Sequence, residues 1–405
     1  MPMSLTIVEF KDAVSKGLGR AVLSITPPVS PEVAELILTS FHRRAFNQYN
    51  NSRGEYRYFL AEKAGLLDEL LVRLTDLPED ESGEVLHERV ELLGSFVRRK
   101  NPVALAAVRS LALNGSMDGI TELVTSGDLK WVVDNILPTL PIDEKWRANV
   151  WLEDNPGVDE ERKQLLLTAY EDYSSNHVID SPPDPPVKDF EQLFCEILYG
   201  APTRSELRKL RRELTQEQFD RIFEVWLSPE SGQQGETAAY ILQNSKLQMD
   251  VGRVIEKVKS GSAPFDFEGI LGEIDMPEIS DLGIELLQED PPDPRGFDCL
   301  RSSYYVEDLD TIAEVLPKFD DFDNVERHWI CLSLIGIAEF DEGKRNLPIM
   351  RWVYEKSPCS FCRLSAVQMM VEAKNLPEEY FEEMRFDSDS EIREVARTYP
   401  AQREE

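Results

Sequence analysis

The fold is decided by a ten-residue stretch near the C-terminus, Asp387-Ser-Asp389-Ser390-Glu-Ile392-Arg393-Glu-Val395-Ala396. This stretch is an acidic turn that runs into a helical pattern with an arginine near its start. Asp389 or Ser390 can accept hydrogen bonds from the N–H groups that open the helix. Acidic side chains at that end also suit the helix dipole. We therefore expect a capped helix here, with its small apolar residues facing a core.

Related stretches occur three more times upstream, each a turn-forming segment followed by a helical pattern that carries an arginine. They are residues 293–300 with Arg295, residues 324–332 with Arg327, and residues 358–367 with Arg363. The steps between the four arginines are 32, 36 and 30 residues. A period of roughly 20–50 residues is typical of repeat proteins, in which each unit completes the core of its neighbour.

The stretch 387–396 resembles the start of the second helix of a HEAT repeat. In that family an Asp-rich turn caps the helix, an arginine points back along the repeat, and small apolar residues face the core. The segment from Cys362 to Val371 fits the same pattern, whereas Pro294 and His328 are not typical at their places in the two earlier copies. The resemblance covers residues 290–400, and it implies an all-α, right-handed α-solenoid of HEAT-like helix pairs.

Helical periodicity continues along the rest of the chain, with almost no alternating strand pattern. Short helix pairs cannot bury a face alone, so the expected helices should stack. We expect helices over residues 30–47, 58–74, 84–97, 102–113, 119–124, 129–137, 160–173, 190–198, 205–214, 216–227, 236–247, 251–260, 280–288, 309–316, 325–340, 348–355, 358–373, 377–384 and 390–398.

A proline-rich segment interrupts the pattern at residues 174–188, where four prolines fall within residues 182–186 and forbid a helix. The sequence therefore predicts an N-terminal helical segment, residues 1–173, a Pro-rich connection, residues 174–188, and C-terminal HEAT-like repeats, residues 189–405. The connection is either a linker between two solenoid segments or an extended loop packed across one of them. Its proline content favours a stiff connection. A weaker break lies at residues 288–294.

Charge is distributed unevenly along the chain. The 405 residues carry 76 Asp and Glu against 44 Lys and Arg, a net charge of −32. Residues 1–100 contribute −2 and residues 101–405 contribute −30. Such a surface repels nucleic acids and anionic membranes and attracts basic partners. One interpretation is that the carboxylates only solvate outward helix faces, and the other is that they dock a basic protein.

One segment, residues 41–59, carries a net positive charge. It contains four arginines, one acid and six aromatic residues. Arginine together with aromatic residues is the composition of binding hot spots and of stacking surfaces for nucleic acids. The alternative is that the aromatic residues fill a core while the arginines pair with carboxylates elsewhere. A second basic cluster, residues 204–212, is typical of the solvated face of an amphipathic helix. The candidate partner-binding residues are Arg43, Arg44, Tyr49, Arg53, Tyr56 and Arg57.

The sequence contains five cysteines, which is an odd number, and most of them lie within apolar helical patterns. Both observations indicate reduced thiols rather than a disulfide framework. Cys359 and Cys362 form the one CxxC, in an expected first helical turn that stabilises thiolates. A redox or metal role is chemically possible. A zinc site needs further ligands, no second CxxC exists, and the four histidines are scattered in the sequence. We therefore interpret both thiols as packed structural residues, with no metal ligand and no cofactor assigned.

Motifs for catalysis are missing from the sequence: it contains no phosphate-binding loop, dinucleotide fingerprint, HExxH or GxSxG. No apolar run approaches the roughly 20 residues of a membrane span, and the N-terminus lacks a signal-peptide pattern, so we expect a cytoplasmic protein. The sequence predicts a non-enzymatic scaffold, a protein–protein interaction module whose acidic surface binds a basic protein. One alternative is an inhibitor or immunity-type protein that neutralises a basic partner. The resemblance also allows a HEAT-like nucleic-acid-binding protein or a DNA glycosylase, although the net charge makes nucleic acid an unfavourable partner.

Overall fold

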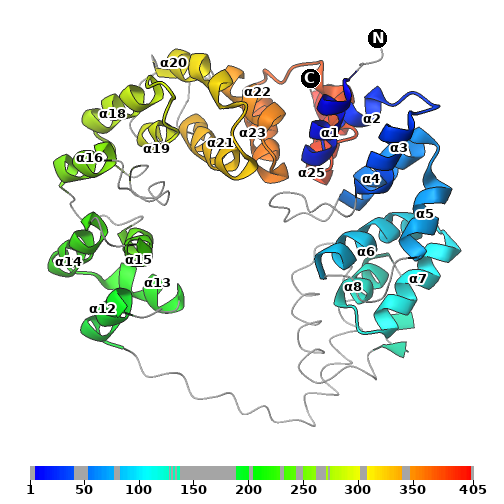
Figure 1. The fold of residues 1–405 in the computed structure, drawn as a ribbon, viewed down its shortest axis with the longest axis horizontal. Coiled ribbons are helices and arrows are strands. Elements are labelled where there is room, and N and C mark those ends of the chain that lie inside the picture. The colour runs from blue at the N-terminus through cyan, green and yellow to red at the C-terminus, as the bar shows by residue number, and fades with distance from the viewer. Residues whose placement is uncertain are drawn as a thin grey trace, which may run out of the picture. The chain divides into compact units, whose positions relative to one another are not determined.

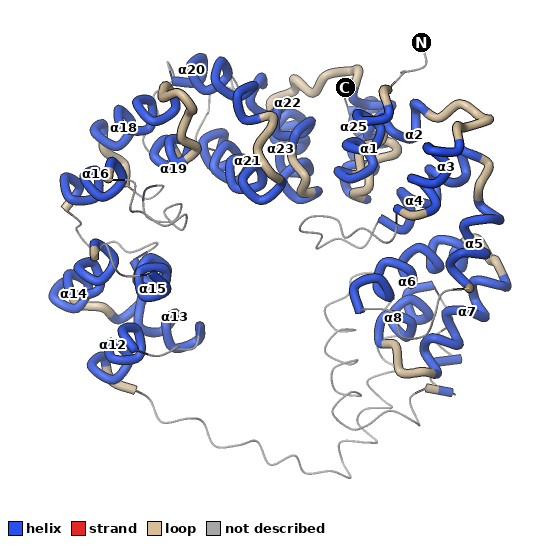
Figure 2. The backbone as a smooth tube through the Cα atoms, viewed as in Figure 1, coloured by secondary structure: helices blue, strands red, loops and turns tan. Residues whose placement is uncertain are grey.

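The chain is all-helical in the computed structural model of residues 1–405 (Figure 1). The structure describes residues 5–40, 53–76, 83–126, 128, 131–132, 135–136, 188–199, 204–228, 232–242, 250–260, 271, 274–301, 308–339 and 347–402. Within these ranges no strand occurs, and helices alternate with short loops (Figure 2). None of the helices in the described ranges has the length and apolarity needed to cross a bilayer.

The chain divides into two compact units. The first comprises residues 1–182, 358–361 and 377–405, and the second comprises residues 183–357 and 362–376. The predicted Pro-rich connection, residues 174–188, lies outside the described residues except for Lys188. The segment 189–405, predicted as one set of repeats, contributes to both units.

The first unit contains ten described helices, and the contacts among α2 to α8 form two interleaved series. α2 contacts α4, α4 contacts α6 and α6 contacts α8, while α3 contacts α5 and α5 contacts α7. From α2 to α8 each helix thus contacts the next but one in the chain, and from α3 onward it also contacts the next helix. The helices are α1 (Ile7–Lys16), α2 (Arg20–Ser24), α3 (Pro31–Leu38), α4 (Arg53–Ala64), α5 (Leu67–Thr75), α6 (Gly83–Arg98), α7 (Pro102–Leu113), α8 (Met117–Ser126), α24 (Tyr380–Met384) and α25 (Ser390–Gln402).

Two features of the first unit differ from the sequence prediction. The first is that helices α1 and α2 were not expected, although Thr6 and Glu9 form a capping box that signals the start of α1. The second is that the single helix expected over residues 58–74 is two helices, α4 and α5. Gly65 separates them with a φ of +72°, a left-handed conformation that interrupts a helix and that glycine adopts without strain.

The C-terminal residues complete the first unit by packing on its N-terminal helices. Arg20 pairs with Glu383 at 2.8 Å, and the Ser388 N–H donates to the Gly17 carbonyl oxygen at 2.8 Å. A Cβ placed on Gly19 would lie 1.8 Å from the Glu383 carbonyl oxygen. Only glycine allows the backbone to approach this closely.

The second unit repeats the same rule of packing. α14 contacts α16, α16 contacts α18, α18 contacts α20 and α20 contacts α22, while α18 also contacts α19 and α19 contacts α21. The helices are α12 (Phe190–Tyr199), α13 (Arg204–Glu213), α14 (Gln216–Leu227), α15 (Gly232–Leu242), α16 (Val251–Lys259), α18 (Pro277–Leu287), α19 (Arg295–Leu300), α20 (Asp308–Val315), the 3₁₀ helix η3 (Leu316–Phe319), α21 (Asn324–Glu339), α22 (Leu347–Lys356) and most of α23 (Ser360–Glu372).

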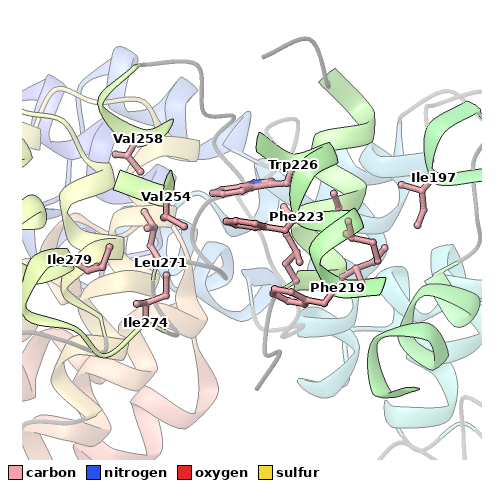
Figure 3. Packing of buried hydrophobic residues seen from close by; sticks show 14 of the residues in the cluster. Ile197, Phe219, Phe223, Trp226, Val254, Val258, Leu271, Ile274 and Ile279 are labelled. Atoms are coloured by element: carbon pink, nitrogen blue, oxygen red, sulfur yellow. The ribbon is translucent and has the colours of Figure 1, made fainter. Parts of the chain in front are cut away.

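An apolar cluster forms the core of α12 to α19 in this unit (Figure 3). On α14 the rings of Phe219, Phe223 and Trp226 follow the helical spacing and stack, with centroids 6.3 Å and 5.6 Å apart. Val254 and Val258 of α16 belong to the same cluster. Burying one such aromatic or aliphatic side chain is worth about 1.5–3 kcal/mol, so α14 is a main source of stability here.

The repeated arginine takes the same place in three helices. Arg327, Arg363 and Arg393 are each the fourth residue of α21, α23 and α25. Arg393 donates to the carbonyl oxygens of Asp387 and Ser388, at 2.6 Å and 3.1 Å, and Arg327 donates to a carbonyl oxygen of its own preceding loop in the same way. Arg295 differs, because it is the first residue of α19. On α23 the side chains at positions 366 and 367 are buried, as the helical phase predicts.

Candidate docking surface

Carboxylates dominate one part of the second unit. Within the described residues 275–301 and 308–323, ten carboxylate side chains are exposed, and Lys318 is the one exposed cation. We call these ten residues the acidic face. They are Asp275, Glu278, Asp281, Glu285, Glu289, Asp290, Asp310, Glu314, Asp321 and Asp323. A single-sign surface of this kind raises the local potential felt by an approaching cation.

Helix geometry groups five of these carboxylates on two helices. On α18 the acids at positions 278, 281 and 285 share one side, because residues three and four apart are neighbours on a helix. The opposite side of α18 is buried through Ile279, Leu282 and Leu286. On α20 the acids at positions 310 and 314 are neighbours in the same way. Near the starts of the two helices, Ser280 Oγ donates to Asp308 Oδ2 at 3.3 Å, which sets α18 and α20 side by side.

Some of the charge on this surface is neutralised within the unit. Lys259 Nζ lies 2.7 Å from Glu285 Oε2, and Lys356 Nζ lies 2.5 Å from Asp320 Oδ2. Exposed pairs such as Lys259–Glu285 contribute roughly 0–1 kcal/mol each and are screened by salt. The remaining carboxylates leave a large negative excess that is available to a partner.

An exposed apolar pair lies directly after the last acids of this face. Val325 and Trp329 are 51% and 40% exposed and are four residues apart on α21, so they share one side of the helix. Asp323 caps α21, since its Oδ1 accepts from the Val325 N–H at 2.7 Å. Exposed tryptophan beside charged groups is the composition of an interface anchor. The sequence analysis predicted this helix but assigned no role to Trp329.

The predicted partner-binding residues do not form an exposed cluster among the described residues. Arg43, Arg44 and Tyr49 lie outside the described residues. The other three are buried: Arg53 donates to the Ser15 carbonyl oxygen at 2.6 Å, and Tyr56 Oη donates to that of Leu18 at 3.0 Å. Arg57 forms a buried ion pair with Glu88 of α6. These contacts tie α4 to the end of α1, to the loop after α1 and to α6. The prediction that all six residues bind a partner stays a prediction.

The first unit contains a buried carboxyl group that the sequence analysis did not identify. Burial raises the pKa of Glu122 on α8 to about 7, although Arg98 Nη1 donates to its Oε1 at 2.7 Å. The carboxyl occupies the space beside Gly94, whose Cβ would lie 2.1 Å from its Cδ atom. Burial also raises the pKa of Glu91 on α6. Because the four residues are separated by up to 31 positions in sequence, only the packing of α6 on α8 reveals the cluster.

Three possible metal ligands lie together around α21 and the start of α23. His328, Cys359 and Cys362 are all buried, and one ligand atom from each lies within 4.8 Å of the others. The sequence analysis treated the histidines as scattered. The packing corrects this, since His328 Nδ1 lies 3.5 Å from Cys362 Sγ.

Comparison of the chain with protein-family models, with curated proteins and with solved structures found no match. The argument for a function therefore rests on the surfaces and clusters described above.

Proposed function

We propose that this chain is a scaffold of HEAT-like helix pairs, a right-handed solenoid, that binds a basic protein through the acidic face of its second unit. The solenoid arrangement is supported by the contacts of α2 to α8, and of α14, α16, α18, α20 and α22, each with the next but one in the chain. It is also supported by the arginine at the fourth position of α21, α23 and α25. Repeat arrays of this type present extended surfaces for partners.

The observation that carries the proposal is the excess of ten exposed carboxylates over one exposed lysine within the described residues 275–301 and 308–323. Carboxylates spaced along two adjacent helices can meet several lysine or arginine side chains of one partner. Complementary charge of this kind speeds association and rejects partners of like sign. A basic protein is therefore the partner class that this surface fits best.

Trp329 and Val325 supply a second element of the proposed interface. Charged rims mainly affect association, whereas a few buried aromatic anchors dominate affinity. We assign the carboxylates to attraction of the partner and Trp329 to the contact that becomes buried in the complex. This division of roles predicts different kinetic effects for the two kinds of substitution.

The same surface would serve an inhibitor or immunity-type protein that neutralises a basic enzyme. The two cases differ in whether the partner loses an activity when it binds. We do not propose nucleic-acid binding or glycosylase chemistry. Both relied on the arginines of residues 41–59, and the guanidinium groups of Arg53 and Arg57 are engaged inside the first unit.

The test is affinity capture from the native cell with mass spectrometry, using three baits. The first bait is the wild type, and the second carries Asp281→Asn, Asp310→Asn, Glu314→Gln and Asp321→Asn on the acidic face. The third is a matched control with four exposed acids of the first unit neutralised, namely Glu32→Gln, Glu62→Gln, Asp68→Asn and Asp76→Asn.

We expect a basic protein that the wild type and the control retain and that the acidic-face variant loses. A captured set that is identical for all three baits would contradict the proposal. Loss of the same protein from the control as well would place the interface elsewhere or indicate an effect of net charge alone.

A further inference from the structure

The cluster of His328, Cys359 and Cys362 combines three side chains that metals bind, and all three are buried. Their exposed fractions are 6%, 1% and 0%. Histidine nitrogen and cysteine sulfur are the ligands that Zn²⁺ prefers in proteins. None of the three belongs to the ten residues of the acidic face, and the proposed function gives them no role.

The two cysteines are held by one turn of backbone. Cys362 is the third residue of α23, and Cys359 is the residue that precedes the helix. The two residues are three positions apart across the start of this helix. A spacing of C-x₂-C at the start of a helix is a common zinc-ligand spacing, and the helix N-terminus stabilises the thiolate form that binds metal.

His328 reaches this turn from a different helix of the second unit. It is the fifth residue of α21, 34 residues before Cys362 in the sequence. The ring therefore meets the sulfur only because α21 and α23 pack together. Ligands drawn from two elements are typical of sites that cross-link a fold.

The distances fit a tetrahedral ion. A sulfur about 2.3 Å and a nitrogen about 2.0 Å from the same tetrahedral Zn²⁺ are separated by about 3.5 Å. The Cys362 Sγ to His328 Nδ1 distance is 3.5 Å. All three ligand atoms already lie within 4.8 Å of one another, so a shift of about 1 Å would bring the set to bonding geometry.

The cysteines themselves favour this interpretation over a disulfide. Neither of them forms a disulfide in the structure. Metal binding would remove one proton from each thiol, so that Zn²⁺ and two thiols give a neutral dithiolate complex and two released protons. Neutral imidazole nitrogen supplies the third bond without further charge.

We propose that His328 Nδ1, Cys359 Sγ and Cys362 Sγ bind one Zn²⁺ ion, with the fourth position taken by water or an external ligand. The bound ion joins α21 to the first turn of α23. The proposed metal site does not depend on the proposed binding of a basic partner.

The test uses the untagged chain of residues 1–405 and Co²⁺ as a spectroscopic probe of the zinc site. Tetrahedral cobalt with thiolate ligands gives a sulfur-to-metal charge-transfer band in the near ultraviolet and intense visible bands. We expect these bands to saturate at one equivalent of Co²⁺ and to disappear when Zn²⁺ is added. Zn²⁺ should also raise the Tm, because an ion that binds only the folded state stabilises it.

The variants identify the ligands. Cys359→Ser and Cys362→Ser should each abolish the charge-transfer band at the same Co²⁺ concentration, whereas Cys195→Ser, at an exposed cysteine, should leave it unchanged. His328→Cys should keep metal binding with a stronger sulfur band, so it remains informative if a serine variant fails to fold. Circular dichroism of each variant checks that the helices are formed.

The proposal is overturned if the wild type gives no charge-transfer band. It is equally overturned if the band persists in the Cys359→Ser and Cys362→Ser variants, or if Cys195→Ser removes it.

Discussion

Gly283 on α18 and Gly296 on α19 face each other, and each leaves room for the other's backbone. A Cβ on Gly283 would lie 2.8 Å from the Gly296 carbonyl oxygen, and a Cβ on Gly296 would lie 2.5 Å from the Gly283 carbonyl oxygen. Backbone atoms cannot move aside as a flexible side chain can. This contact holds α18, which carries three residues of the acidic face, against α19.

Gly283→Ala should therefore destabilise the second unit by about 1–3 kcal/mol, the usual effect of overpacking. The matched control is Gly252→Ala on α16, where a Cβ would meet only Asp250 Oδ1 at an ordinary 3.4 Å. Because alanine favours helices over glycine by up to about 1 kcal/mol, the control should be neutral or slightly stabilising. Urea unfolding followed by circular dichroism measures both. Equal midpoints for the two variants would contradict the close contact of α18 with α19.

The first unit should be more stable below pH 7 than above it because of Glu122. Burial raises the pKa of this carboxyl from 4.5 to about 7. A folded pKa above the unfolded one means that the contribution is fully present below about pH 4.5 and is lost as the pH rises through about 7. Asp298 in the second unit behaves in the same direction, since burial raises its pKa to about 7 as well.

Glu122→Gln should remove the contribution of Glu122 to the pH dependence of stability. It should also stabilise the protein above pH 7 by a few kcal/mol. Its control is Glu62→Gln, at an exposed position, which should leave the pH profile of the Tm unchanged. If Glu122→Gln lowers the Tm above pH 7, the ion pair with Arg98 outweighs burial, and the raised pKa is wrong.

Ala366→Asp should cost several kcal/mol, because it places a charge at a fully buried position of α23. Gln368→Asp introduces the same side chain two residues away, at an exposed position of the same helix. Thermal melts of the two variants should differ widely, with only the first losing a large part of its stability. Similar Tm values would contradict the helical phase of α23.

Trp329→Ala should speed dissociation of the basic partner at least tenfold, since truncating an anchor residue commonly costs more than about 1–2 kcal/mol of binding. The free energy of unfolding of the Trp329→Ala variant should change little, because the Trp329 side chain is 40% exposed. Tyr199→Ala, at a side chain that is 88% exposed on α12, is the control and should leave dissociation unchanged. Surface plasmon resonance measures the association rate and the dissociation rate separately. A wild-type dissociation rate in the Trp329 variant would exclude this residue from the interface.

The sequence could predict those parts of the fold that depend on local pattern. The turn at Asp387 and Asp389, the helix after it and the place of Arg393 all follow from capping and periodicity within ten residues. The same reasoning failed at Gly65, where one left-handed residue divides a continuous apolar pattern into α4 and α5. It also passed over α1, although Thr6 and Glu9 carry a capping signal.

The sites could be predicted only in part, because they depend on residues brought together by packing. His328 and Cys362 are 34 residues apart in the sequence, and Gly94 and Glu122 are 28 apart. Neither pair has a local signature. The aromatic and basic composition of residues 41–59 suggested a surface, but Tyr56 and Arg57 are long amphipathic side chains whose polar ends reach partners inside the unit. Composition alone does not distinguish these two uses of arginine and tyrosine.

The most direct test of the central claim is the association rate of the captured basic partner, measured with the wild type and the acidic-face variant as salt is raised from 0.1 M to 1 M. The screening length falls over this range from about 10 Å to about 3 Å. We predict a steep fall in the wild-type association rate, with a slower starting rate and a flatter slope for the variant, and dissociation rates that change little. Equal association rates and equal salt slopes for the two proteins would contradict binding through the acidic face.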